Sequence, residues 1–324
     1  MTARFILSLD CEGRWGVADQ LESEHARALT DQALRRAYSE VLSALDRFAV
    51  PATFAFVAAF TLSPQRLQAA RPELRRAAAR VQGYVEHAVD ASAGEGWAGD
   101  WALEAVRTAH VTHELALHGA THVPWDRPGF TAAAARAEMQ LAFDLAPELA
   151  RDARTFIYPR NRVEHRTVLS EFGLVGARDD RGRRSRVRSL AEEFLPARPE
   201  ADLPLAEPIR IPAGHFLNWR CGRRRVIPPV ITRERIRRSV AAAERTGATV
   251  HLWTHPENFA SGPGTLDVLR GILEDVARAR DAGRCEVLTQ VDYCRTVDPG
   301  LFDRIARDRT RVHLPEKPGV RGDR

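Results

Sequence analysis

The sequence predicts an α/β fold, built either as a (β/α) barrel or as a doubly wound parallel sheet. Along its 324 residues, short apolar stretches alternate with longer stretches rich in alanine, arginine and glutamate. The apolar stretches are continuous rather than alternating, which is typical of parallel strands buried on both faces. This alternation of strands and helices is typical of parallel α/β sheets.

The expected strands are the stretches in which Val, Ile, Leu and Phe gather. They are residues 4–10, 51–58, 113–118, 154–158, 173–177, 209–211, 249–254 and 285–289. The expected helices are longer, and residues such as Asp144 and Glu148 mark their polar faces. They are residues 24–48, 64–82, 131–150, 163–172, 232–246 and 264–282.

Two segments interrupt this alternation and are expected to be insertions. Residues 83–104 are rich in glycine and contain Trp97, whereas residues 178–208 are rich in Arg, Pro and Glu and are expected to form a long loop. The charged residues 303–324 are expected to form a disordered tail. We therefore expect one domain, residues 1–302, that carries both insertions.

The composition indicates a globular protein rather than a nucleic-acid-binding one. Hydrophobic residues make up 44% of the chain, which is enough for a large core. The net charge is +5, but Lys317 is the single lysine, so the arginine excess indicates a general compositional bias. One arginine cluster is expected to lie in an exposed loop, with a phosphate-bearing substrate or an anionic membrane surface as its alternative partner. Its members are Arg178, Arg181, Arg183, Arg184, Arg186 and Arg188.

The sequence shows no pattern of a signal peptide, and no apolar run approaches the ~20 residues that a membrane span needs. We therefore expect a cytoplasmic protein without a transmembrane segment. The four cysteines are irregularly spaced, which indicates neither a disulfide framework nor a Cys-x-x-Cys metal site.

Three of the expected strands end in side chains that suit metal chemistry. The first leads into Asp10 and Glu12, which share one face of an extended chain. Another leads into His118 and His122, four residues apart, and a late strand leads into His255. Active sites of parallel α/β folds are built where strands end. We therefore expect these side chains to meet.

These residue types can divide the work of a hydrolase. Two histidines and one carboxylate leave coordination positions open for water and substrate, as catalytic zinc sites require, although the same set could hold Fe(II). The second carboxylate can accept a proton from water. His255 is suited to protonate a leaving amine, with a structural or capping role as the alternative.

Arg160 is a further candidate for a catalytic role, and Tyr158, Asn161 and Trp97 are candidates for substrate contact. Arg160 can orient a carboxylate or bind an oxyanion, Tyr158 can offer its backbone N–H, and Asn161 lies in the same strand end. Trp97 can stack on a sugar ring, the alternative being that it packs its own loop down.

At these residues the chain resembles the polysaccharide deacetylases, the NodB-homology group or carbohydrate esterase family 4. The matching pieces follow the family order from residue 5 to about residue 259. They are Leu7–Glu12, Pro51–Val57, Glu114–His122, Phe156–Arg160 and His251–His255. The resemblance implies a distorted (β/α) barrel, usually of seven strands, with a divalent metal at its C-terminal mouth.

The resemblance also implies roles for individual residues. Asp10 would be the general base and His255 the general acid. Glu12, His118 and His122 would hold one divalent ion; zinc is expected, with cobalt, nickel or iron as alternatives. The family usually has arginine two places before its conserved proline, where this chain has Ile157, and Arg160 is the candidate to replace it.

The expected activity is the removal of acetyl from an N-acetylated amino sugar, with a nucleotide- or lipid-linked sugar as one form of the substrate. The alternative enzymes are a deformylase and an allantoinase-like hydrolase of cyclic amides. Outside enzymes, the alternatives are a non-catalytic carbohydrate-binding protein and an arginine-rich nucleic-acid binder. No recognised nucleic-acid motif supports the last of these.

Overall fold

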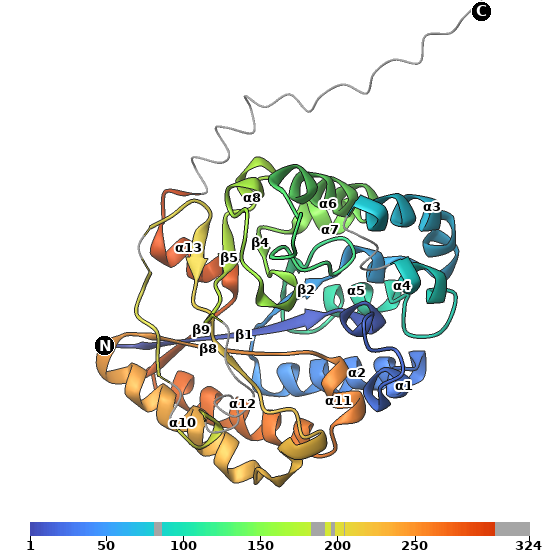
Figure 1. Cartoon of the computed structure of the whole chain (residues 1–324). Coiled ribbons are helices and arrows are strands. Elements are labelled where there is room, and N and C mark those ends of the chain that lie inside the picture. Colours follow the sequence, from blue (N-terminus) through green and yellow to red (C-terminus); the bar gives the residue numbers. More distant parts are fainter. Residues whose placement is uncertain (81–85, 183–191, 196–197, 204, 302–324) are drawn as a thin grey trace, which may run out of the picture.

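Parallel strands form the centre of the molecule, and helices surround them (Figure 1). The computed structural model describes residues 1–80, 86–182, 192–195, 198–203 and 205–301. The expected tail and parts of both expected insertions lie outside the described residues. Nine strands are found in the part of the chain that is described. They are β1 (Ala3–Cys11), β2 (Thr53–Phe56), β3 (Glu114–Leu117), β4 (Thr155–Phe156), β5 (Gly176–Arg178), β6 (Ile209–Ile211), β7 (His215–Phe216), β8 (Thr249–Thr254) and β9 (Cys285–Leu288).

All the strand pairs of the sheet are parallel, and their order is β6-β5-β4-β3-β2-β1-β8-β7. β1 is the longest strand and has three partners. Its residues Arg4–Leu9 pair with β8, whereas Ala3–Ile6 pair with β9 and Ser8–Cys11 with β2. The expected parallel α/β architecture is therefore confirmed.

The curled sheet closes through a single segment of chain. β6 pairs with β5 at one end of the sheet, and β7 pairs with β8 at the other. Only Pro212–Gly214 separate β6 from β7, so the two are one interrupted strand. Counted in this way, the path around the barrel has the seven strands that were expected. β7 itself was not predicted, because two residues show no periodicity.

Helices fill the connections between the strands, and α2, α12 and α10 lie side by side along one face of the barrel (Figure 1). The described α-helices are α1 (Glu24–Ala28), α2 (Asp31–Phe48), α3 (Pro64–Arg80), α4 (Glu86–Ala91), α5 (Asp100–Arg107), α6 (Ala132–Leu145), α7 (Pro147–Asp152), α8 (Thr167–Glu171), α10 (Pro229–Thr246), α11 (Glu257–Ser261), α12 (Thr265–Asp281) and α13 (Gln290–Val297). The short 3-10 helices are η1 (Gly13–Val17), η2 (Ala58–Thr61), η3 (Pro159–Asn161), η4 (Glu192–Phe194) and η5 (Gly222–Val226). No described helix is long and apolar enough to cross a membrane.

Local capping explains where two of the expected helices divide. The helix expected at 24–48 breaks before Thr30, whose hydroxyl accepts a hydrogen bond from Ala33 N and so starts a new helix. The helix expected at 131–150 breaks before Pro147, which stands at the first position of α7. α4 and α5 lie within or next to the segment expected as the first insertion, and α11 and α13 were not predicted.

The two faces of β1 pack against different parts of the core. Phe5, Leu7 and Leu9 belong to the large cluster between the strands and the helices. Ile6 faces the other way, into a smaller cluster that includes Tyr293 of α13. Because side chains alternate along a strand, the polar residues Ser8 and Asp10 follow Ile6 on the same face.

His251 of β8 is a buried part of this inner face. Its Nδ1 lies 2.6 Å from the Pro212 carbonyl and its Nε2 lies 2.8 Å from Ser8 Oγ. Nδ1 therefore donates to the carbonyl, and Nε2 accepts from the hydroxyl. Burial, with a contribution from Arg178, lowers the pKa of His251 to about 3.

We expect His251 to weaken the fold as the pH falls. Its pKa is about 3 in the folded state and 6.5 in the unfolded state, so the unfolded chain binds the proton first. The free energy of unfolding should therefore drop by about 2 kcal/mol between pH 7 and pH 5 on account of this residue. Urea unfolding at the two pH values measures the drop, which should be smaller in His251→Gln. An unchanged drop in the variant would contradict the assignment.

Candidate active site

Polar side chains from four strands meet at one end of the barrel. β1 leads to Asp10 and Glu12, β3 leads to His118, and β8 leads to His255. These residues stand where their strands end, and the carboxyl ends of parallel strands share one edge of a sheet. β5 adds a residue that was not predicted as part of the site, Arg178.

The carboxylate of Glu12 lies at the centre of this group. Its Oε1 is 3.0 Å from His118 Nε2, 2.9 Å from His122 Nε2 and 3.5 Å from His255 Nε2. Two triads have ligand atoms within 4.8 Å of one another: Glu12 with His118 and His122, and Glu12 with Asp10 and His255. The structure therefore brings together all five residues expected to carry the chemistry.

The turn from His118 to His122 is fixed by its backbone and by α6. Gly119 and His122 have φ angles of 81° and 62°, in the left-handed region that lets the chain reverse within one turn. Glu138 of α6 accepts hydrogen bonds from the N–H groups of Ala120 and Thr121, each 2.9 Å long. This tight turn at Gly119 aims both imidazoles at Glu12.

Both imidazoles of this turn present their Nε2 atoms to Glu12. His118 donates Nδ1–H to the Ile157 carbonyl at 2.7 Å, which directs its Nε2 toward Glu12. His122 is buried, its Nε2 lies 2.9 Å from Glu12 Oε1, and its Nδ1 has no hydrogen-bond partner among the described residues. Burial lowers the pKa of His122 despite the nearby Glu12. The Glu12 oxygen and the two Nε2 atoms therefore converge, as the ligands of a cation do.

Glu257 holds Glu12 in place, and it was not singled out from the sequence. Its Oε1 accepts hydrogen bonds from Glu12 N at 3.0 Å and from Gly13 N at 2.6 Å. Burial, followed by the charge of Glu12, raises the pKa of Glu257 to about 7. The signal available in the sequence was its position two residues after His255, at the start of α11.

His255 is the most exposed of the five residues, with 22% of its side chain accessible. Its Nε2 lies 4.0 Å from Asp10 Oδ2, and its Nδ1 lies 3.2 Å from the Asn258 amide. Burial alone would lower its pKa, but Glu12 and then Asp10 outweigh that effect and raise the pKa of His255 to about 9. The imidazole is therefore protonated at neutral pH in this environment.

Asp10 is paired with Arg178 by two hydrogen bonds. Arg178 Nη1 and Nη2 lie 2.8 Å and 2.6 Å from the two carboxylate oxygens, and Asn161 Oδ1 accepts a further bond from Nη2 at 2.7 Å. The guanidinium also lies 4.7 Å from the centre of the Trp253 ring. Burial raises the pKa of Asp10, but Arg178 more than offsets it, so the pKa is lowered.

The expectation that Arg178 lies in an exposed loop is wrong, because its side chain is fully buried. It is the last residue of β5, and its charge is neutralised by Asp10 from β1. Of the same cluster, Arg181 is described and pairs with Glu200 at 2.6 Å. The other four, from Arg183 to Arg188, lie outside the described residues.

Arg160 does not reach Asp10. Its Nη2 bonds to the Gly16 carbonyl at 2.9 Å and to Asp19 at 2.5 Å. The guanidinium that faces Asp10 therefore belongs to Arg178 and not to Arg160. Arg160 lines the cavity described next, so its contact with a substrate oxyanion stays a prediction.

The expectation that Trp97 stacks on a substrate is wrong. The Trp97 side chain is 1% exposed and packs edge-on against Trp15, with ring centres 5.1 Å apart. Its carbonyl accepts a hydrogen bond from Trp15 Nε1 at 3.0 Å. The alternative role, in which Trp97 packs its own loop against the core, is the one observed.

Two other aromatic side chains flank His255. Trp253 and Phe216 are partly exposed, and their ring centres lie 5.8 Å and 5.9 Å from that of His255. Both line a cavity of about 420 Å³, together with Asn161 and Arg160. Tyr158 is fully buried, and its backbone N–H has no hydrogen-bond partner among the described residues.

No protein-family model matches the chain, and no curated protein matches it. Several solved structures, however, match the chain. A Mycobacterium smegmatis protein assigned as a polysaccharide deacetylase has a TM-score of 0.55 and 16% identity, over 98% of this chain and 95% of that one. The chain has the polysaccharide deacetylase fold.

Two further solved structures share this fold but are named for other activities. The allantoinase PuuE has a TM-score of 0.50 and 16% identity, over 90% of this chain and 89% of that one. A GH57-type branching enzyme from Pyrococcus horikoshii has a TM-score of 0.50 and 12% identity, over 90% of this chain and 70% of that one. One fold therefore hosts several chemistries, and the activity must be argued from the site.

We expect Arg178→Gln to lower the free energy of unfolding by about 3–5 kcal/mol, because Asp10 then stays buried without its counter-charge. Chemical unfolding measures the loss, and adding Asp10→Asn to the same chain should recover part of it. Arg210→Gln is the control, since Arg210 is 40% exposed and its loss should cost about 1 kcal/mol or less. Equal losses in the two single variants would contradict a buried pair.

Proposed function

We propose that this protein is a metal-dependent amide hydrolase that removes acetyl from an N-acetylated amino sugar. The observation that carries the proposal is the convergence of two imidazoles on the Glu12 carboxylate, with Asp10 and His255 beside it. Each of these side chains supplies one function that amide hydrolysis requires.

The donor set fits a divalent ion. Glu12, His118 and His122 would hold it, because their ligand atoms converge and the buried nitrogens of His122 have no other partner in the described structure. The bond from His118 Nδ1 to the Ile157 carbonyl keeps Nε2 free for a metal and fixes the ring, as is usual for ligating histidines. Two nitrogens and one oxygen suit zinc, with cobalt, nickel and iron as alternatives.

A divalent ion at this position would polarise the amide carbonyl and lower the pKa of a water molecule. Asp10 acts as the general base and takes the proton of the attacking water. Arg178 and Asn161 hold the Asp10 carboxylate in one orientation. Its lowered pKa keeps Asp10 ionised at neutral pH, which is the form that a base requires.

His255 acts as the general acid. It is 22% exposed and lies beside Trp253 and Phe216 of the cavity wall, and nearby carboxylates raise its pKa, so it can deliver a proton to the departing amine. The unpartnered N–H of Tyr158 would donate to the oxygen of the tetrahedral intermediate. Acetate and a free amino sugar are the products.

The cavity supports a sugar ring as the substrate. Trp253 and Phe216 give it an apolar wall next to His255, and partly exposed aromatic rings bind the apolar faces of sugars. In this proposal Trp253 takes the role that was expected of Trp97. The likeness to an allantoinase makes a cyclic amide the second candidate substrate.

Metal analysis tests the ligand assignment. We expect about one divalent ion per wild-type chain and none in the His118→Ala/His122→Ala double variant, because two of the three ligands are removed. Elemental analysis of the purified proteins makes the measurement. His110→Ala is the matched control, since His110 is exposed and should keep the metal. Metal retained in the double variant would refute the site.

Acetate release tests the activity. We expect the metal-loaded protein to release acetate from an N-acetylated amino sugar, and Asp10→Asn to lower kcat by about 10²–10⁴-fold while the metal content is unchanged. A carbohydrate-binding protein would show no turnover in either form and equal sugar affinity in both. Hydrolysis of allantoin without acetate release would favour the cyclic amide.

A further inference from the structure

The positive charge of the chain is concentrated in one segment. Residues 220–238 contain eight arginines and one glutamate, a net charge of +7, while the whole chain carries +5. This segment comprises η5 and the first half of α10. Carboxylates outside the segment neutralise part of this charge, because Glu193 pairs with Arg224 and Arg235 and Asp275 pairs with Arg233.

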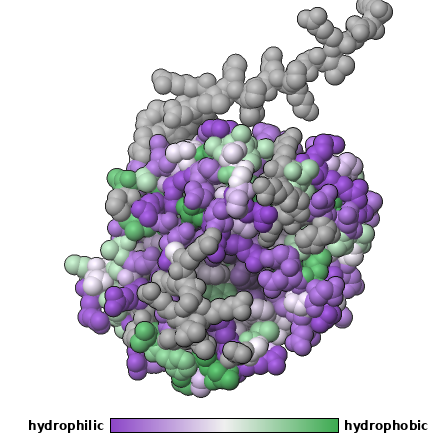
Figure 2. Space-filling model, viewed as in Figure 1, coloured by the Kyte–Doolittle hydropathy of each residue, from purple (hydrophilic) through white to green (hydrophobic). Residues whose placement is uncertain are grey.

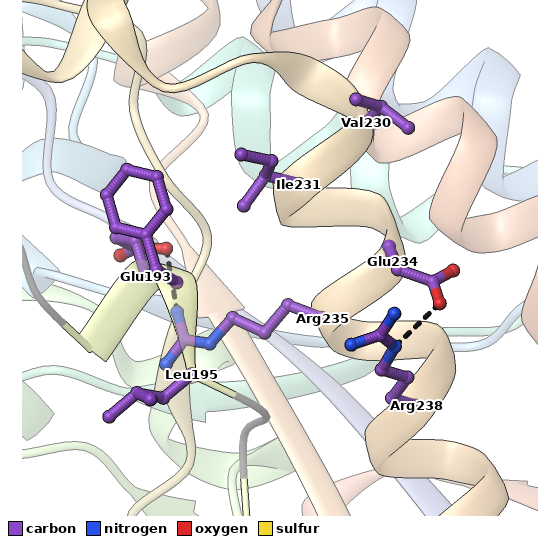
Figure 3. Close-up of a pocket in the computed structure, with 8 residues that line it drawn as sticks. Glu193, Leu195, Val230, Ile231, Glu234, Arg235 and Arg238 are labelled. Atoms are coloured by element: carbon purple, nitrogen blue, oxygen red, sulfur yellow. Dashed lines mark hydrogen bonds and ion pairs between the residues drawn. The ribbon is translucent and has the colours of Figure 1, made fainter.

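Exposed apolar side chains lie in the same place. Val226 of η5 and Val230 of α10 are 74% and 67% exposed, and Phe194 and Leu195 at the end of η4 are 56% and 59% exposed. Hydrophobic residues are visible along the lower edge of the molecule (Figure 2). In Figure 3, Leu195 lies opposite Val230 and Ile231 across a cavity of about 250 Å³.

Ion pairs fix these elements to one another. Glu193 of η4 binds Arg235 of α10 at 2.7 Å, which is drawn in Figure 3, and it also binds Arg224 of η5 at 2.9 Å. The exposed apolar residues therefore form a preformed surface. We call it the basic-apolar surface and define it by Phe194, Leu195, Arg220, Arg225, Val226 and Val230.

The arginines of this surface keep their charge available. Arg220 bonds to the carbonyls of Pro263 and Ile227, and Arg225 bonds to the carbonyl of Arg220. Neither has an acidic partner among the described residues. Farther along α10, Arg237 and Arg238 share the single carboxylate of Glu234.

We infer that the basic-apolar surface binds an anionic lipid bilayer. Guanidinium groups attract lipid phosphates, and neighbouring Val, Leu and Phe side chains can enter the boundary between headgroups and acyl chains. A nucleic acid would use the arginines but would give the exposed aliphatic side chains no apolar environment. The combination of both features on one rigid surface favours the bilayer.

The position of this surface gives the inference a consequence for access to the site. Glu193, Arg224 and Arg235 line the larger cavity as well, together with Asn161 and Arg160. A bilayer on the basic-apolar surface would therefore lie next to the entrance of that cavity. The inference does not rest on the proposed hydrolase activity.

Sedimentation with lipid vesicles tests the inference. We expect the wild-type chain to pellet with vesicles of phosphatidylcholine and phosphatidylglycerol but not with vesicles of phosphatidylcholine alone. Arg220→Gln/Arg225→Gln should weaken the partition coefficient by about 25-fold, at about fivefold per arginine. Val226→Ser/Val230→Ser should weaken it by about tenfold without any change of charge.

The control is Arg76→Gln/Arg151→Gln, which removes the same charge from exposed positions on α3 and α7. It should bind vesicles as the wild type does. Equal binding by all variants, or no binding by the wild type, would overturn the inference. So would binding to single-stranded DNA that ignores the valine changes, or dimers that those changes abolish. Because sedimentation needs no turnover, failure here is separate from failure of the proposed activity.

Discussion

The buried ion pair between Asp10 and Arg178 organises the mouth of the barrel. Its two residues come from β1 and β5, which are 168 positions apart in the chain. Arg178 also binds Ser8 at 3.1 Å and Asn161, so a single guanidinium links β1, β5 and η3. Removing two charges from water is costly, and their attraction offsets that cost only because every oxygen and N–H involved has a partner.

Features encoded within a few neighbouring residues could be predicted from the sequence. Strands at 209–211 and 249–254 have the predicted bounds, and the turn at Gly119 follows from local spacing. Arg178 and Trp97 could not be placed, because their burial depends on Asp10 and Trp15, which are distant in sequence. A stretch rich in arginine predicts an exposed loop, and only the structure shows that Asp10 is the buried partner of Arg178.

The likeness to a deacetylase, an allantoinase and a branching enzyme shows how little the barrel itself specifies about chemistry. The strands provide positions, and the side chains at their ends determine the reaction. In this chain the same carboxylate, Glu12, takes part in both triads of potential ligands. Glu257 fixes the backbone of Glu12 from the segment that also carries His255. The two sides of the site are therefore joined by one short stretch of chain after β8.

The junction between β6 and β7 has an evolutionary consequence. Pro212–Gly214 connect the two ends of the sheet, and Gly214 lies so close to His251 that a Cβ there would meet its carbonyl oxygen at 2.7 Å. Ala213 and Gly214 also line the large cavity. Residues gained or lost between Ile211 and His215 would therefore change the lining of this cavity. A change in length at this single seam is thus one way in which relatives of this fold could differ in the ligand they admit.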